Sequence, residues 1–282
     1  MEFKIAPERV FLLKDVLSFE EAKKKAWDKK LEIFGTFDQL TSFLSKPKDE
    51  DFELTYSEHR FQPFWHIHSK ANYVYDRKAD YQIPVAGPEV QSVHVLETEY
   101  MVTNKHIHVP VMEHCLQTFE EESFIDGLNG QKKPDYKAYL NGISEQIDLD
   151  KIEASTKKED IIVPPQARVS AIMREMLARM IHGIQADKIH EENIEVKCVD
   201  LYFKPIYSFK YRWISKNKET IVEIDSLNGN ASSGSRTFQE YLGKFIDRDF
   251  LFDLGADAAG MFIPGGSIAV KVTKKVLDAG KK

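Results

Sequence analysis

The sequence contains few cysteines and no long apolar run. Cys115 and Cys198 are the only two cysteines among 282 residues. Two cysteines are too few for the disulfide framework of a small secreted domain, and they are typical of a reducing compartment. Residues Met1–Pro7 lack the apolar core of a secretory signal, and no uncharged apolar stretch is long enough to span a bilayer. We therefore expect a cytoplasmic protein.

An excess of basic charge is also missing. Lys and Arg number 39 against 45 Asp and Glu, so the formal net charge is −6. Non-specific nucleic-acid binding depends on Lys and Arg that neutralise phosphates, and this composition argues against nucleic acid as a partner. Hydrophobic residues make up 42% and charged residues 30% of the chain, which is typical of a folded globular protein.

Several catalytic motifs are absent as well. The sequence has no Gly-x-Gly-x-x-Gly fingerprint, no His-Glu-x-x-His and no Cys-x-x-Cys pair. Residues Gly260–Ser267 are superficially similar to a phosphate-binding loop, but Gly266 stands where the phosphate-contacting lysine is required. We therefore expect no nucleotide hydrolysis and assign no catalytic residue.

The sequence does contain three short blocks that occur twice in the same order. A block with a central proline comes first, an Asp-x-Leu-Asn-Gly turn follows, and an aromatic block ends the series. The pairs are Phe61–Trp65 with Phe203–Tyr207, Asp126–Gly130 with Asp225–Gly229, and Tyr136–Leu140 with Phe238–Leu242. This recurrence indicates an internal duplication whose shared residues maintain shape.

The duplication predicts an α+β fold with two related lobes, each a helix plus an antiparallel meander. The first lobe covers residues 1–143 and carries an insertion near 88–120. A polar linker over 144–163 leads to the second lobe, residues 164–246. A C-terminal extension over 247–282 completes the chain, and we expect it to be helical.

Local patterns support individual elements. Phe52, Leu54 and Tyr56 alternate with polar residues, which predicts a strand. Apolar residues at three-and-four spacing between Val169 and Ile181 predict a helix. Ser18 and Glu21 have the spacing of a helix capping box. The Asn-Gly pairs in both turns predict type I′ hairpins, in which both central residues have positive φ.

Residues Val222–Asp225, followed by Ser-Leu-Asn-Gly, resemble the PepSY family. In that family, a strand that ends in an Asp-x-x-x-Gly turn closes a small unit of helix and antiparallel sheet. Phe124–Asp126 with its turn is similar. The resemblance implies tandem cystatin-like α+β units that bind or inhibit other molecules and do not catalyse reactions.

Histidines supply a candidate metal site. Two His-x-His pairs on predicted strands each place both rings on one face, and a cysteine follows the second pair. Imidazole and thiolate together suit zinc, the only cofactor that the sequence suggests. The candidate ligands are His66, His68, His106, His108 and Cys115. The alternative is that these histidines are simply solvated or hydrogen-bonded.

Aromatic residues and the C-terminal segment supply candidate contacts with a partner. Ile268, Val272 and Val276 would share one side of a C-terminal amphipathic helix that has lysines on the other side. The candidate contact residues are Trp65, Tyr207, Trp213, Ile268, Val272 and Val276. We expect a non-catalytic binding or assembly protein that contacts a protein partner or another copy of itself. The alternatives are a zinc-binding protein or metal-dependent hydrolase, and a membrane-surface adaptor.

Overall fold

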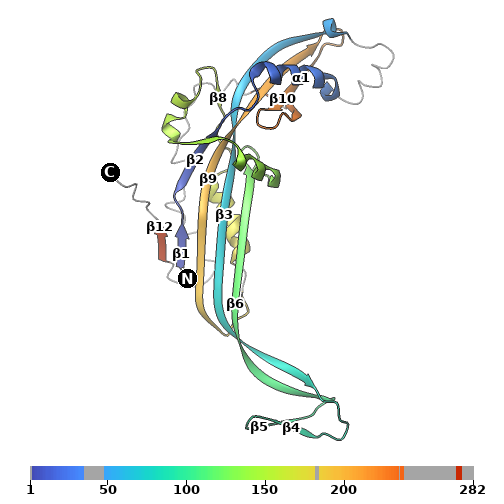
Figure 1. Ribbon diagram of the computed structural model, residues 1–282, viewed down its shortest axis with the longest axis vertical. Helices are drawn as coiled ribbons and strands as arrows, with labels where there is room; N and C mark the ends of the chain where they lie inside the picture. Colours follow the sequence, from blue (N-terminus) through green and yellow to red (C-terminus); the bar gives the residue numbers. More distant parts are fainter. Residues whose placement is uncertain (1, 35–47, 182–183, 235, 238–270, 275–282) are drawn as a thin grey trace.

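A single mixed sheet of ten strands dominates the computed structural model (Figure 1). The structure describes residues 2–34, 48–181, 184–234, 236–237 and 271–274. Its elements in chain order are β1 (Glu2–Ile5), β2 (Glu8–Leu13), α1 (Phe19–Phe34), η1 (Asp49–Asp51), β3 (Phe52–Pro84), β4 (Ser92–Val95), β5 (Thr98–Met101), β6 (His106–Asp126), η2 (Pro134–Asn141), β7 (Ser144–Ile147), η3 (Leu149–Lys151), η4 (Glu153–Ser155), β8 (Ile161–Ile162), α3 (Val169–Met180), β9 (Lys188–Trp213), β10 (Lys218–Asp225), β11 (Ala231–Gly234) and β12 (Lys271–Lys274).

Three long antiparallel strands form the centre of this sheet. β3 pairs with β9 on one side, from Phe52 opposite Trp213 to Asp76 opposite Lys188. On its other side β3 pairs with β6 along the whole length of β6. Aromatic and β-branched side chains alternate with polar ones along these strands, as a half-buried sheet requires. The shorter strands extend the sheet from β9 or flank β3.

The two copies of the proline block lie side by side in the sheet and run in opposite directions. Gln62 is opposite Lys204, its own counterpart in the repeat, and Pro63 is opposite Phe203. Each long strand also forms an antiparallel hairpin, β3 with β6 and β9 with β10. These pairings are related by an approximate two-fold axis that passes through the sheet between Gln62 and Lys204.

The repeated turns obey the same symmetry. The N–H of Gly127 donates to the carbonyl of Pro63 at 2.9 Å, and that of Ser226 donates to Pro205 at 3.2 Å. In both turns the aspartate side chain accepts a bond from the backbone N–H two residues later. Gly130 and Gly229 have φ of 73° and 74°. Because the asparagines of these two turns do not have positive φ, the predicted type I′ geometry is wrong.

Each helix covers the hairpin of the other copy. α1 begins with the predicted capping box and packs on aromatic residues of β9 and aliphatic residues of β10. The predicted helix at Val169 is confirmed as α3, whose apolar face joins the core beside β3. There the hydroxyl of Tyr73 donates to the carbonyl of Met180 at 3.1 Å. Because each helix packs on the hairpin of the other copy, the two copies form a single body.

The predicted α+β class with two lobes is therefore wrong. The described part of the chain is mostly β, with 54% of its residues in strands and 20% in helices. The proline blocks pair with each other, so both copies contribute to one sheet. Residues 144–163 supply β7 and β8, which pair with β2 and β3.

The helical C-terminal extension is also wrong where the structure describes it. Residues Lys271–Lys274 form β12, and Val272 is opposite Phe3 of β1 in a parallel pair. Val272 and Thr273 are β-branched, which fits a strand. Ile268 and Val276 lie outside the described residues. In the described part of the chain, none of the helices is long and apolar enough to cross a membrane.

The β3–β6 hairpin continues well beyond the rest of the sheet. β9 stops pairing at Asp76, and residues 77–84 and 106–113 continue as a two-stranded ribbon (Figure 1, lower end). The loop between them contains the small hairpin of β4 and β5. We call residues 77–113 the β-arm. In the other copy, by contrast, the β9–β10 hairpin closes directly after Trp213.

Candidate functional site

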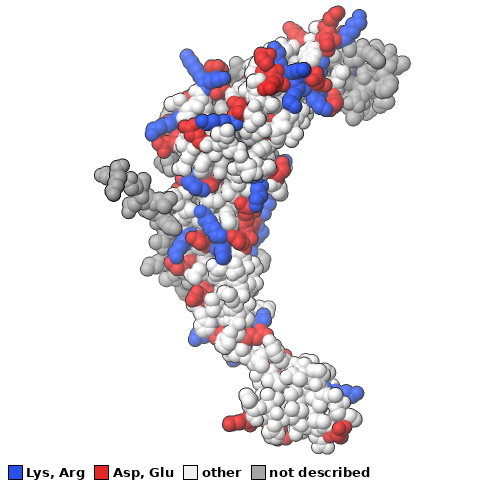
Figure 2. All heavy atoms as spheres, viewed as in Figure 1, with Lys and Arg blue, Asp and Glu red and all other residues white. Residues whose placement is uncertain are grey.

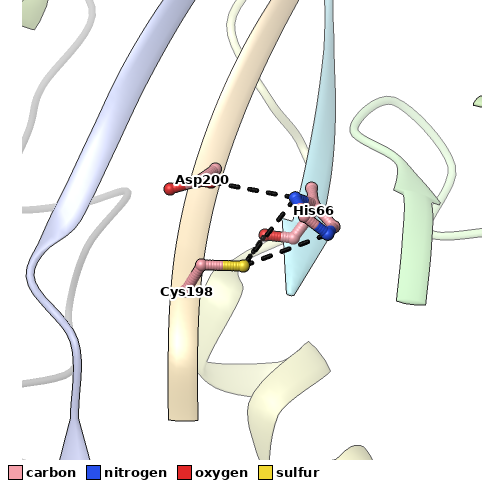
Figure 3. A group of neighbouring side chains, drawn as sticks. All are labelled: His66, Cys198 and Asp200. Carbon is pink, nitrogen blue, oxygen red and sulfur yellow. Dashed lines mark hydrogen bonds and ion pairs between the residues drawn. The ribbon is translucent and has the colours of Figure 1, made fainter. Parts of the chain in front are cut away.

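A buried group of three polar side chains lies where β3 and β9 pair (Figure 3). The register places His66 opposite Asp200 and His68 opposite Cys198, so Cys198 and Asp200 reach the same face of β9 beside the His66 ring. The exposed fractions are 8% for His66, 8% for Cys198 and 1% for Asp200. We call these three residues the His66 cluster.

Arg9 of β2 holds the carboxylate of Asp200. Its Nε donates to Oδ1 at 2.8 Å and its Nη2 donates to Oδ2 at 2.7 Å. Such a bidentate pair fixes the orientation of a carboxylate as well as its charge. Burial alone would raise the pKa of Asp200, but hydrogen bonds from His66 and Arg9 outweigh burial and lower it. Asp200 is therefore ionised at neutral pH.

His66 lies between two carboxylates. Its Nε2 is 3.0 Å from Oε1 of Glu122, and its Nδ1 is 3.7 Å from Oδ2 of Asp200. The ring stacks on Phe124 with centroids 4.6 Å apart. Burial would lower the pKa of His66, but its acidic neighbours raise it to about 10. The imidazole is therefore cationic at neutral pH when only protons are available.

The sulfur of Cys198 completes the group. Sγ is 3.7 Å from Nδ1 of His66 and 3.9 Å from Nε2, so it is almost equally far from the two ring nitrogens. One nitrogen, one sulfur and one carboxylate oxygen lie within 4.8 Å of one another. Such a donor set can bind a thiophilic metal ion. A nucleophilic role for the thiol would require substrate access, which the burial of Cys198 opposes.

The other predicted metal ligands lie elsewhere. His68 contacts Glu120 at 2.8 Å, and His108 contacts Asp80 at 2.6 Å. The Nδ1 of His106 is 2.9 Å from the carbonyl oxygen of Asn104, while Cys115 is close to the carbonyl of Glu113. From His108 to Phe124, which stacks on His66, β6 extends roughly 50 Å at about 3.3 Å per residue. The five candidates do not converge, and only His66 belongs to the cluster.

Sequence reasoning missed Cys198 and Asp200 as neighbours of His66. Alternation within a strand identifies which residues share a face, but it does not identify the partner strand. The duplication contained a usable signal. If the two proline blocks pair about Gln62 and Lys204, then His66 must be opposite Asp200.

The three aromatic residues predicted to contact a partner are core residues. Trp65 is fully buried, and its Nε1–H donates to the carbonyl of Ala167 at 2.8 Å. Tyr207 packs in the cluster beneath α1, and Trp213 packs against Phe52. Their exposed fractions do not exceed 7%. These side chains stabilise the fold and are not available as a binding surface.

The β-arm instead presents a partly exposed apolar face. Ala79, Tyr81 and Ile83 of β3 share this face with their cross-strand partners Val111, Val109 and Ile107. Tyr81 is 50% exposed and Ile83 is 44% exposed, whereas Ile107 is buried and the other three are half-buried. The opposite face carries polar residues such as Lys78, Asp80 and Gln82. The arm is mostly uncharged on the side visible in Figure 2 (lower end).

The apolar face of the arm continues the face that α3 covers in the body. Tyr73 lies beneath the end of α3, and Tyr75 is only 7% exposed. Along the same face beyond Arg77, Tyr81 and Ile83 are exposed to solvent. An apolar strip that is covered in the body therefore becomes exposed in the arm.

Comparisons with known proteins do not assign the chain to a family. No protein-family model matches it, and no match was found among curated proteins or solved structures. The resemblance to PepSY units consequently has no support beyond the short motif that suggested it.

Proposed function

We propose that this chain is a non-catalytic assembly protein that contacts a second copy of itself through the apolar face of the β-arm. The exposed strip around Tyr81 and Ile83 is the single observation that carries this proposal. Contiguous exposed apolar surface on a soluble protein commonly marks an interaction site. A two-stranded ribbon is also only marginally stable alone in water, and packing against a partner would stabilise it.

A second copy suits this surface because the face is complementary to itself. Face-to-face packing of two arms would bury Tyr81 and Ile83 of each chain in an isologous contact. Complete burial of one such side chain contributes about 1.5–3 kcal/mol. The polar face would remain in water, where the ion pair between His108 and Asp80 lies.

Packing through the face is favoured over strand addition at the edge of the arm. Within the described residues, β3 is the one strand that pairs with β6, and other bridges to β6 lie only at its two ends, so the outer edge between them is open to a further strand. Pro110 lacks a backbone N–H and therefore interrupts the row of hydrogen-bond donors along β6. Charged side chains such as Glu113 also line β6. Proline and charge are features that protect edge strands from pairing.

The proposal also covers the cellular location. Cys115 and Cys198 are both free thiols, which suits a reducing cytoplasm. The membrane-surface alternative depended on a C-terminal amphipathic helix, and β12 now occupies part of that segment. It is therefore not retained.

The mass of the full chain in solution tests the assembly proposal. We expect light scattering to show a concentration-dependent dimer, and the double substitution Tyr81→Ser with Ile83→Ser to weaken dimerisation at least tenfold. Lys78→Ser with Gln82→Ser, on the opposite face of the same strand, is the matched control and should leave the dimer unchanged. A monomeric wild-type chain at about 100 μM, well above typical dissociation constants of specific dimers, would contradict the proposal.

A further inference from the structure

We propose that His66, Cys198 and Asp200 form a binding site for a thiophilic divalent cation, with Zn²⁺ as the ion that fits best. This inference is independent of the β-arm and of assembly. It rests on the distances among the donor atoms and on the groups that orient them.

The donor atoms are already close to the spacing that zinc requires. Zn²⁺ holds nitrogen and oxygen at about 2.0–2.2 Å and sulfur at about 2.3 Å, so tetrahedral neighbours lie roughly 3.3–3.6 Å apart. In the His66 cluster, Nδ1 is 3.7 Å from Oδ2 of Asp200 and 3.7 Å from Sγ of Cys198. All three atoms lie within 4.8 Å of one another. Small side-chain rotations would bring them around one ion.

Glu122 orients the imidazole for this role. It contacts Nε2 at 3.0 Å, so it can accept the Nε2 proton and leave Nδ1, which is 3.7 Å from both the sulfur and Asp200, available for an ion. Histidines that ligate zinc commonly donate their other N–H to a carboxylate, which fixes the tautomer and makes the ligand more basic. Lys137 pairs with Glu122 in turn and holds that carboxylate.

Arg9 orients Asp200 without occupying all of its acceptor sites. An ionised carboxylate offers about four lone-pair positions, and the two bonds from Arg9 use two of them. Oδ2 therefore keeps a position for an ion. The guanidinium would act as a positioning group for the ligand, as second-sphere groups do in metal sites.

A zinc ion would be held here by the neutral imidazole, the thiolate and the carboxylate, so any protons on the nitrogen and the sulfur would pass to solvent as it binds. Three protein ligands would leave the fourth position of a tetrahedral ion for water.

Metal titration of the full chain tests this inference. After removal of metal with a chelator, we expect one Zn²⁺ per chain by calorimetry. Co²⁺, used as a spectroscopic probe, should give the visible bands of a tetrahedral ion and a thiolate-to-cobalt charge-transfer band. Cys198→Ser and His66→Gln should each weaken Zn²⁺ binding at least 100-fold. Glu122→Gln should weaken it about tenfold, the lower end for groups that orient a ligand.

Two matched controls are available in the same sheet. Cys115→Ser changes the other cysteine, and His68→Gln changes a neighbouring histidine that contacts Glu120 instead. Both controls should bind Zn²⁺ as the wild type does. The inference is wrong if the wild type binds no Zn²⁺ at micromolar concentration, or if Cys115→Ser abolishes binding and Cys198→Ser does not. Should the ligand variants fail to fold, a wild-type Co²⁺ spectrum without the thiolate band would overturn it equally.

Discussion

The two copies of the repeat differ most at one pair of equivalent positions. In one half of the sheet, Asp200 is opposite His66, whereas in the other half Glu58 is opposite Ser208. Glu58 accepts a bond at 2.6 Å from Arg60 of its own strand. Asp200 is held by Arg9 of β2, which leaves its strand neighbours free to be histidine and cysteine. The symmetric positions share a buried carboxylate, but only one of them has donors for a metal.

Shared residues in the repeat maintain shape, whereas altered residues add properties. The aspartates of both turns make equivalent backbone contacts. The altered positions include His66, and the β-arm extends one hairpin where the other closes after Trp213. Both proposed sites therefore lie where the two-fold symmetry fails.

The largest expected effect is the loss of Glu58. In Glu58→Gln the fully buried guanidinium of Arg60 loses one of its carboxylate partners and cannot reach water. Removing one partner of a buried ion pair typically costs about 3–5 kcal/mol. We expect a loss of this size in the free energy of unfolding, measured by urea denaturation at pH 7. If Glu58→Gln lowers the free energy of unfolding by less than Asp200→Asn does, the expected order of the two halves is wrong.

Asp200→Asn should cost less than Glu58→Gln in metal-free protein. The side chain of Arg9 is 41% exposed and remains hydrated when the carboxylate is neutralised, and His66 keeps its contact with Glu122. We expect a loss of about 1.5–3 kcal/mol, the range for hydrogen bonds to charged groups. The same urea denaturation measures it, with Asp80→Asn in the exposed β-arm as a control that should change nothing.

Secondary structure in this protein was easier to predict than the pairing of its strands. The three-and-four spacing of α3 and the capping box of α1 are local signals, and both are present in the structure. The register between β3 and β9 is a long-range property, because alternation specifies faces but not partners. The sequence of a short segment such as 271–274 is compatible with a helix or with a strand. In this protein, pairing with β1 makes the segment a strand.

The candidate site could be predicted only in part, for the same reason. His66 was identifiable as a donor, but Asp200 is distant from it in sequence, and Arg9 and Asp200 are 191 residues apart. Their contact depends on β2 pairing in parallel with β9, where Arg9 is opposite Asp200. The exchange of helices between the two copies was equally invisible, since each helix has an ordinary apolar face that does not specify its hairpin.

His59 gives a pH test of another difference between the halves. It lies opposite Tyr207. At the symmetry-related position in the other half, the buried Leu201 lies opposite Trp65. Burial lowers the pKa of His59, but Asp15 and Asp160 raise it from the usual 6.5 to about 9. Since the folded pKa is raised, the stabilisation is complete below about pH 6.5 and is lost as pH rises through 9.

We expect the stability difference between wild type and His59→Gln to shrink by about 1–2 kcal/mol between pH 6 and pH 9.5, allowing for solvent screening. Urea denaturation across this range measures the difference. His114→Gln, which changes an exposed histidine that pairs with Asp76, is the control and should show a smaller dependence on pH. A constant difference for His59→Gln would show that its carboxylate neighbours do not stabilise the charged ring.

Shortening the arm should have the smallest effect on stability. Residues 77–113 can be replaced by residues 214–217, the turn that closes the equivalent hairpin. Because the exposed arm contributes little to the core of the body, we expect the free energy of unfolding to change by less than about 0.5 kcal/mol, as for surface changes generally. Dimerisation should be lost in the same protein. A large loss of stability in the monomer would mean that the arm supports the body and is not a separate contact element.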